Sequence, residues 1–210
     1  MNVNRFEKED ETGYPSVRKA KIVRQTGETS VELELCLDGQ GQAQLDIPVP
    51  FLSHMLHLFA VHSGCDLTIQ ASGDIEVDDH HLVEDIGICL GRALYESLGD
   101  KVGIRRYGQR YTPMDEALAR TVLDFSGRSA FVWQAEFRQD KIGQFSTELV
   151  EEFFKSVANE ARMALHMAVL YGSNHHHMVE ALFKSYAAAL REAVTLEHHQ
   201  RLLSSKGVLE

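Results

Sequence analysis

The sequence predicts an α+β fold that consists of two fused copies of one unit, and three observations support this prediction. A short pattern of His and Glu residues occurs twice in the chain at a constant spacing. Runs with strand-like and helix-like periodicity follow one another in the same order in both halves. No Pro- or Ser-rich linker separates the halves, so we expect the two copies to pack into one body.

The first copy combines strand-like and helix-like segments. Apolar and polar residues alternate from Val31 to Leu37, which predicts a half-buried strand that ends at the Asp38-Gly39 turn. Helices are predicted where apolar residues recur at helical spacing, and Gly99 is a typical residue at a helix end. In order, we expect a strand at 31–37, a helix at 48–64, strands at 66–70 and 73–77, and a helix at 78–99.

The second copy repeats this order. A Ser126-Gly127-Arg128 turn separates two runs typical of strands, and Asn174 is a favourable N-cap for the last helix. We expect strands at 121–125 and 130–137, a helix at 146–166 and a helix that begins at Asn174. The predicted boundaries are a polar N-terminal arm at 1–16, a first repeat at 17–110, a second repeat at 111–200 and a C-terminal tail at 201–210.

The repeated pattern is His-His-x-x-Glu, and equivalent residues of its two copies are 96 positions apart. On a helix its three side chains point into one quarter-turn sector, because successive residues are rotated by about 100°. Imidazoles and carboxylates are ligands for Mn²⁺, Fe²⁺ or Zn²⁺. A lone His pair is more often a solvated surface feature, but two in-register copies predict metal binding. The copies are His80, His81 and Glu84 in the first repeat and His176, His177 and Glu180 in the second.

A second alignment of the two halves supports the duplication. Residues 51–56 align with residues 149–154 at an offset of 98 positions, and their apolar positions coincide almost throughout. A change of two residues in loop length explains why this offset differs from that of the His-His-x-x-Glu pattern. The alignment places His54 of the first repeat opposite Glu152 of the second.

Composition excludes several classes of partner. The net charge of −10 and the pI of about 5.5 argue against nucleic acids and anionic membranes, which require basic surfaces. No apolar run approaches the roughly 20 residues of a membrane-spanning helix, and the first residues do not resemble a signal peptide. The three Cys residues are scattered, so we expect reduced thiols in a cytoplasmic protein.

Several short segments resemble those of the imidazoleglycerol-phosphate dehydratase family, and they occur in the family's order along residues 17–209. The resemblance is carried by Thr26-Gly27-Glu28-Thr29, His54-Met55-Leu56, the run 78–85, Arg106-Tyr107-Gly108, the run 113–117, Ser126-Gly127-Arg128, the run 174–184 and the run 204–209.

The resemblance implies a fold, an assembly and a reaction. The fold would be two ferredoxin-like βαβ repeats, similar to ribosomal protein S5 domain 2, with sheets packed on a helical layer. The assembly would be a homo-oligomer of 24 subunits with sites shared between chains. The reaction belongs to histidine biosynthesis and removes water from a small phosphate ester, imidazole glycerol phosphate, to give imidazole acetol phosphate. Two Mn²⁺ ions per active site would stabilise the substrate ring as an imidazolate.

The resemblance also implies residue roles. Glu28 corresponds to the residue that acts as the base, although by itself it would be interpreted as a surface charge beside a turn. The implied phosphate-binding and substrate-binding residues supply cations and hydroxyl donors. They are Arg106, Arg128, Lys184, Ser204 and Lys206. The implied metal ligands are His54, His80, His81, Glu84, His176, His177 and Glu180.

The chain departs from the family pattern at three positions. Glu152 stands where the family usually has a His ligand, and we hypothesise that its carboxylate replaces the imidazole at Mn²⁺. The alternative is that Glu152 points away and the metal keeps a water molecule. His57 and Leu58 also differ from the usual residues, so the resemblance assigns no substrate contacts to these two positions.

Two other functions remain open at the level of sequence. One is a different dinuclear metal lyase or hydrolase on the same scaffold, and the other is a metal-storage or metal-sensing oligomer. The retained Glu28 and the Ser-Ser-Lys-Gly tail argue against storage, because metal storage requires neither.

Overall fold

The computed structural model describes residues 17–197 and 201–209; the predicted arm at 1–16 lies outside them. The first half forms a four-stranded sheet in the order β1-β2-β4-β3, in which only β3 and β4 are parallel. Two helices belong to this half. The elements are β1 (Lys19–Gln25), β2 (Thr29–Cys36), β3 (Ala43–Asp46), α1 (Pro50–Ser63), β4 (Asp66–Gly73) and α2 (His80–Leu98).

The second half repeats this topology. Its sheet has the order β5-β6-β10-β7, again with one parallel pair, β7 and β10. A short hairpin, β8–β9, is added before α3. The predicted duplication and α+β class are therefore confirmed. The elements are β5 (Tyr107–Met114), β6 (Ala117–Asp124), β7 (Ala130–Gln134), β8 (Lys141–Ile142), β9 (Phe145–Ser146), α3 (Glu148–Glu160), β10 (Ala164–Tyr171) and α4 (His175–Val194).

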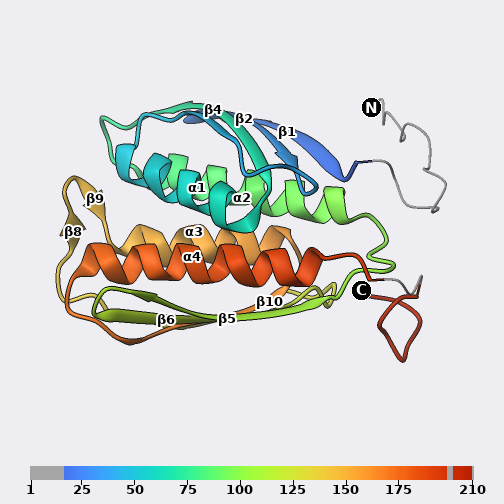
Figure 1. Ribbon diagram of the computed structural model, residues 1–210. Coiled ribbons are helices and arrows are strands. Elements are labelled where there is room, and N and C mark those ends of the chain that lie inside the picture. The colour runs from blue at the N-terminus through green and yellow to red at the C-terminus, as the bar shows by residue number, and fades with distance from the viewer. Residues whose placement is uncertain (1–16, 198–200, 210) are drawn as a thin grey trace.

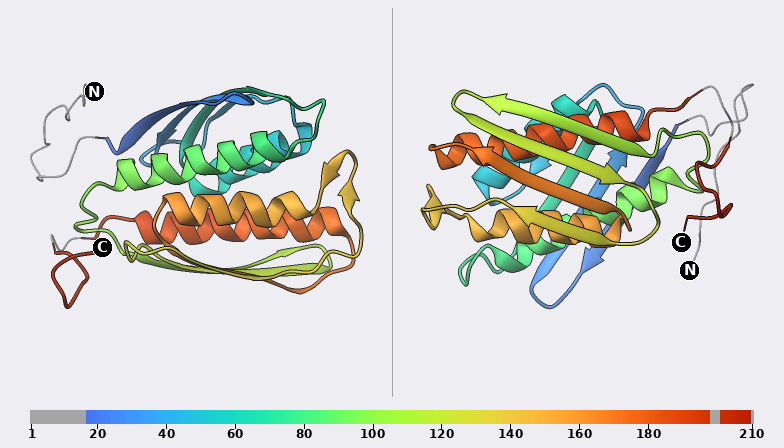
Figure 2. Two further views of the ribbon diagram at one scale, coloured as in Figure 1. Left: turned by 180° about the vertical axis from the view of Figure 1, so that it is seen from behind. Right: turned by 90° about the horizontal axis from the view of Figure 1, so that it is seen from below.

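The four helices lie between the two sheets (Figure 1). Each sheet turns its apolar face inward, as the alternating burial along β2 and β6 shows. The helices of one half pack on those of the other, α1 on α4 and α2 on α3. All four helices begin at the end of the molecule that carries the β8–β9 hairpin (Figures 1 and 2). The residues at the helix starts are thereby gathered at one end.

Two glycines set the close approach of α2 and α3. A Cβ atom at Gly87 would lie 2.8 Å from the carbonyl oxygen of Phe153, and one at Gly91 would lie 2.6 Å from that of Val157. Both contacts advance by four residues on each helix, so α2 and α3 run side by side in the same direction. Earlier along the helices, the same alignment places Glu84 of α2 level with Val150 in the first turn of α3, two residues before Glu152.

Two predicted elements are wrong. The strand expected at 73–77 is absent, because β4 ends at Gly73 and a turn follows it. The helix expected at 146–166 ends at Glu160, where Arg162 adopts a positive φ of 49° and the chain enters β10. The alternation of apolar residues in β10 fits a helix over a short window as well as a strand, so pairing with β6 and β7 decides its conformation.

Three edge strands of the two main sheets and both strands of the β8–β9 hairpin were not predicted. β1 and β3 are edge strands of the first sheet, and β5 is an edge strand of the second. Edge strands carry many exposed polar residues, which weakens the alternation on which a strand prediction depends. β5 begins at Tyr107, so the predicted boundary after residue 110 falls inside this strand. In the described part of the chain, no helix is both long and apolar enough to span a membrane.

Candidate active site

Helices from the two halves bring three potential metal ligands together. His54 lies on α1, and His176 and Glu180 lie on α4. One ligand atom from each lies within 4.8 Å of the other two. The Glu180 Oε2 atom is 3.2 Å from His176 Nε2 and 3.9 Å from His54 Nε2. Two imidazole nitrogens and one carboxylate oxygen fit a divalent transition metal, and the half-exposed imidazoles leave room for further ligands.

Local interactions hold the α4 part of this group. The Asn174 side chain caps the helix, and its Oδ1 atom accepts hydrogen bonds from the backbone N–H groups of His176 and His177. Phe51 of α1 packs against the His176 ring edge to face, at 5.4 Å between centroids and an interplanar angle of 80°. The start of α4 is therefore fixed both by its cap and by contact with the other repeat.

Glu180 is the buried member of the group, with only 8% of its side chain exposed. Burial raises the pKa of Glu180, but hydrogen bonds from Lys184 and His176 outweigh this effect and hold the pKa below its ordinary value. Lys184 Nζ lies 2.5 Å from Glu180 Oε1. Glu180 therefore stays ionised, as a metal ligand must be.

A second group of potential ligands consists of Glu28, Asp74 and His81. His81 Nδ1 lies 3.1 Å from Asp74 Oδ2 and 3.7 Å from Glu28 Oε2. The pKa of His81 is raised, mainly by the hydrogen bond to Asp74. Asp74 follows β4, whereas Glu28 lies in the turn between β1 and β2.

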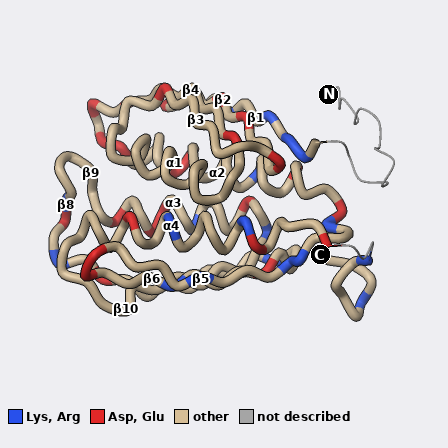
Figure 3. The backbone as a smooth tube through the Cα atoms, in the orientation of Figure 1, with Lys and Arg blue, Asp and Glu red and all other residues tan. Residues whose placement is uncertain are grey.

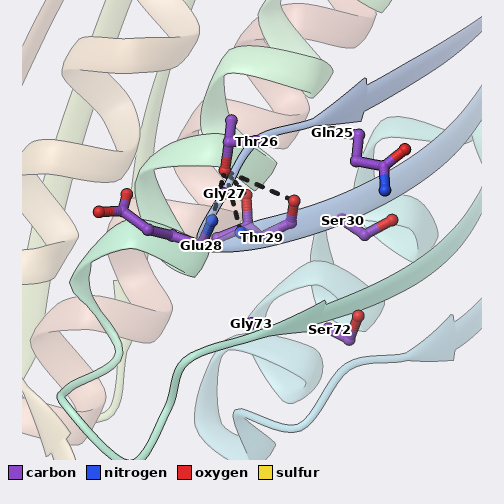
Figure 4. Close-up of a pocket in the computed structure, with 8 residues that line it drawn as sticks. All are labelled: Gln25, Thr26, Gly27, Glu28, Thr29, Ser30, Ser72 and Gly73. Carbon is purple, nitrogen blue, oxygen red and sulfur yellow. Dashed lines mark hydrogen bonds between the residues drawn. The ribbon is translucent and has the colours of Figure 1, made fainter.

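The turn that carries Glu28 is well defined (Figure 4). Thr26 Oγ1 accepts hydrogen bonds from the backbone N–H groups of Glu28 and Thr29, at 3.1 and 2.9 Å. Residues 25–30 line a shallow pocket together with Ser72 and Gly73, but the Glu28 carboxylate points away from the other residues drawn. It is 56% exposed and lies toward His81.

The remaining His of the second motif has a different partner. His177 Nδ1 lies 2.7 Å from Glu116 Oε2, and this hydrogen bond raises the pKa of His177 and lowers that of Glu116. Glu116 lies in the turn between β5 and β6. Sequence reasoning assigned no role to Glu116 or Asp74, although Glu116 lies in one of the segments that carry the family resemblance.

His80, Glu84 and Glu152 do not form a comparable group among the described residues. The backbone N–H of His80, the first residue of α2, donates to Asp78 Oδ1 at 2.8 Å, whereas the N-cap residue Asp79 makes no capping hydrogen bond with its side chain. Both Glu152 carboxylate oxygens accept from Lys155 Nζ one turn along α3, at 3.2 and 3.3 Å. Glu152 is thus engaged with a cation of its own helix.

The other positions at which the chain departs from the pattern lie on α1. His57 is exposed and lines the same surface hollow as His54. Leu58 is partly buried and packs against the hydrophobic core. His57 is therefore close enough to affect access to His54, whereas Leu58 has a packing role.

Arg106 lies at the opposite end of the molecule from the helix starts. Its guanidinium forms a two-point ion pair with Asp124, at 2.6 and 2.9 Å, and donates to the carbonyl oxygen of Leu203 in the C-terminal tail. Its backbone N–H donates to Ala193 near the end of α4. From His176 to Ala193, α4 extends by about 25 Å at a rise of about 1.5 Å per residue.

The other predicted phosphate-binding residues divide between the two ends. The tail residues Ser204 and Lys206 are held in a turn, in which Ser204 Oγ accepts from the Lys206 N–H and donates to Val208. This tail is joined to Arg106 through Leu203. Arg128 lies in the turn that follows β6, and this turn starts next to Arg106. Lys184 instead lies beside Glu180, in the group of potential metal ligands.

Comparison with known proteins gives these groups a context. A model of the imidazoleglycerol-phosphate dehydratase family matches residues 47–190. The chain is 54% identical to the imidazoleglycerol-phosphate dehydratase of an Exiguobacterium species and 53% identical to that of Bacillus subtilis. Each alignment spans 194 residues, which is 92% of this chain and the full length of the relative. The chain belongs to the imidazoleglycerol-phosphate dehydratase family.

Solved structures of the family agree with this assignment. The imidazoleglycerol-phosphate dehydratase of Staphylococcus aureus superposes with a TM-score of 0.78 at 42% identity, over 85% of this chain and 99% of that one. The Pyrococcus furiosus enzyme superposes with a TM-score of 0.77 at 36% identity, over 90% of this chain and all of that one. The predicted fold, the hydro-lyase class and the link to histidine biosynthesis are confirmed for this imidazoleglycerol-phosphate dehydratase family member.

Proposed function

We propose that the chain removes water from imidazole glycerol phosphate to give imidazole acetol phosphate, in a Mn²⁺-dependent reaction in the cytoplasm. The single observation that carries the metal dependence is the meeting of His54, His176 and Glu180, which come from helices of different repeats. The basic residues are spread over several elements and interspersed with acidic ones, which suits a small anionic substrate better than a polyanion (Figure 3).

The proposed ligands divide between two Mn²⁺ ions per active site. The observed group provides one set of donors, and the duplication suggests a second set in which Glu152 takes the place of His54. When bound, Mn²⁺ supplies Lewis acidity that makes the imidazole ring of the substrate an electron sink. The full proposed set is His54, His80, His81, Glu84, Glu152, His176, His177 and Glu180.

Glu28 is the proposed base. Its carboxylate would accept the proton from the substrate carbon that keeps its hydroxyl, while the C–O bond at the carbon next to the ring breaks and hydroxide leaves. This hydroxide and the proton held by Glu28 together make up the water that is released. The resulting enol then becomes the ketone of the product. Support comes from the position of Glu28 next to His81 and from its exposure, which allows contact with a bound substrate.

The distribution of cations supports a site shared between copies of the chain. Arg106, Arg128, Ser204 and Lys206 would bind the phosphate, together with Lys184 from the metal side. Arg106 lies about 25 Å from His176 along α4, which is too far for one small substrate to contact both in one chain. A homo-oligomer, which the family resemblance suggests has 24 subunits, would bring the Arg106 end of one chain to the His176 end of another.

Glu152 provides a test of the second set of ligands. We expect Glu152→Gln to reduce Mn²⁺ binding and turnover, because an amide is a weaker ligand than a carboxylate. Glu152→His, which restores the usual family residue, is expected to preserve both. The measurements are metal content and kcat. Unchanged metal content in the Gln variant would show that Glu152 does not bind the metal.

Metal dependence itself can be tested by chelation. Removal of divalent ions is expected to abolish dehydration of imidazole glycerol phosphate, and added Mn²⁺ is expected to restore it, since the ligands are pre-arranged in the fold. Product formation is the measurement. Activity that persists after complete metal removal would contradict the proposal. Mn²⁺ binding without any dehydration would favour metal storage or another dinuclear lyase or hydrolase.

A further inference from the structure

The two second histidines of the His-His-x-x-Glu motifs are held in the same way by carboxylates outside the motifs. His81 Nδ1 is within hydrogen-bond distance of both oxygens of Asp74, at 3.1 and 3.3 Å. His177 Nδ1 is 2.7 Å from Glu116 Oε2. In both cases the Nδ1 atom faces a carboxylate. We propose that Asp74 and Glu116 are positioning residues, which orient His81 and His177 so that Nε2 is presented to the metal.

This inference rests on the proposed metal-dependent function. It adds two positioning residues to that function and assigns the Nδ1–H tautomer to the two histidines. A neutral imidazole that donates Nδ1–H to a carboxylate carries its free lone pair on Nε2. Such a carboxylate fixes the orientation of the ring and increases the basicity of the ligand nitrogen. Asp74 and Glu116 would therefore act through His81 and His177 without contact with the metal.

Glu116 is well suited to this role because its own position is fixed. Its Oε1 atom accepts hydrogen bonds from the backbone N–H groups of Ser173 and Asn174, at 3.0 and 2.7 Å, and from Ser173 Oγ at 3.2 Å. The other oxygen is left for His177. The β5–β6 turn is thereby tied to the start of α4, and the His177 ring is held from outside its own helix.

The carboxylate beside the second histidine comes from a different part of the fold in each repeat. The turn between β1 and β2 in the first repeat corresponds to the turn between β5 and β6 in the second, so Glu28 corresponds to Glu116. Glu28, however, lies 3.7 Å from His81 Nδ1, beyond a hydrogen bond, and Asp74 takes the position beside the ring. In the first repeat, Asp74 therefore frees the carboxylate of the turn for proton transfer. In the second repeat, the carboxylate of the turn orients the histidine itself.

The test compares Mn²⁺ affinity, measured by calorimetry on the full-length protein, with turnover as a function of Mn²⁺ concentration. Asp74→Ala and Glu116→Ala are expected to weaken Mn²⁺ binding about 10- to 100-fold. The Mn²⁺ affinities of Asp74→Asn and Glu116→Gln are expected to lie between those of the Ala variants and that of the wild type, because an amide oxygen still accepts a hydrogen bond from Nδ1–H. The Asn and Gln variants also decide the matter where an Ala variant fails to fold. The matched control is Glu76→Gln, which removes one exposed negative charge close to Asp74 and should bind Mn²⁺ like the wild type.

A positioning role also predicts that saturating Mn²⁺ restores most of the turnover of the Asn and Gln variants. Turnover that stays low at saturating Mn²⁺ would assign these carboxylates to the chemistry and overturn the inference. Unchanged Mn²⁺ affinity in the Asn and Gln variants would also overturn it. Failure of the proposed function is a distinct result, because the wild-type protein itself would then not bind Mn²⁺ or would not dehydrate the substrate.

Discussion

Glu28→Gln is expected to lower kcat by about 10²- to 10⁴-fold, the usual contribution of a general base. The amide has nearly the shape of the carboxylate but cannot accept the proton from carbon. The backbone of the turn should persist, because Thr26 Oγ1 accepts from the N–H of residue 28 and not from its side chain. Mn²⁺ affinity should change little, since Asp74 and not Glu28 forms the hydrogen bond to His81.

Steady-state assays of product formation and calorimetry of Mn²⁺ binding together check this expectation. Glu34→Gln is a suitable control, because Glu34 is exposed on β2 and pairs only with Lys21 in the described chain. Its kcat should match that of the wild type. A Glu28→Gln protein with near-normal kcat would contradict the role of Glu28 as the base and direct attention to the other carboxylates near His81 and His177.

A mixture of two inactive variants is expected to recover activity. Arg106→Ala removes a proposed phosphate-binding cation, and His176→Ala removes a proposed metal ligand, so each variant alone should lose nearly all turnover. When the two proteins are unfolded together and refolded, about one interface in four receives an intact Arg106 from one chain and an intact His176 from another. Dehydration should therefore return to at most about a quarter of the wild-type rate.

The control for this mixture is each variant refolded by itself, with the assembled size measured by light scattering. Recovery only in the mixture would agree with a site built from two chains, since about 25 Å of α4 separates the two residues within one chain. Fully assembled but inactive mixtures would contradict the shared site. A monomeric protein with full activity would contradict it as well.

Much of the fold and of the candidate site could be predicted from the sequence, because the potential metal ligands are closely spaced along helices. The His-His-x-x-Glu motifs, the N-cap Asn174 and the helical runs depend on local periodicity, which a linear pattern preserves. The alignment of His54 with Glu152 followed from the same duplication. The edge strands β1, β3 and β5 were missed because exposed polar residues obscure their alternation. The first residues of β10 were included in a helix because the pairing partners of this strand are remote in the chain.

The sequence by itself determined the duplicated α+β architecture, the residue types of a metal site and the resemblance to the dehydratase family. Only the tertiary structure decided which residues meet. It brought His54 to His176 and Glu180, placed Asp74 and Glu116 beside the second histidines, and left Glu152 with Lys155. It also separated Arg106 from the potential metal ligands His176 and Glu180 by most of the length of α4. The physical reason is that local periodicity orients a side chain on its own element, whereas the packing of parallel helices and the turns of two sheets determines its neighbours.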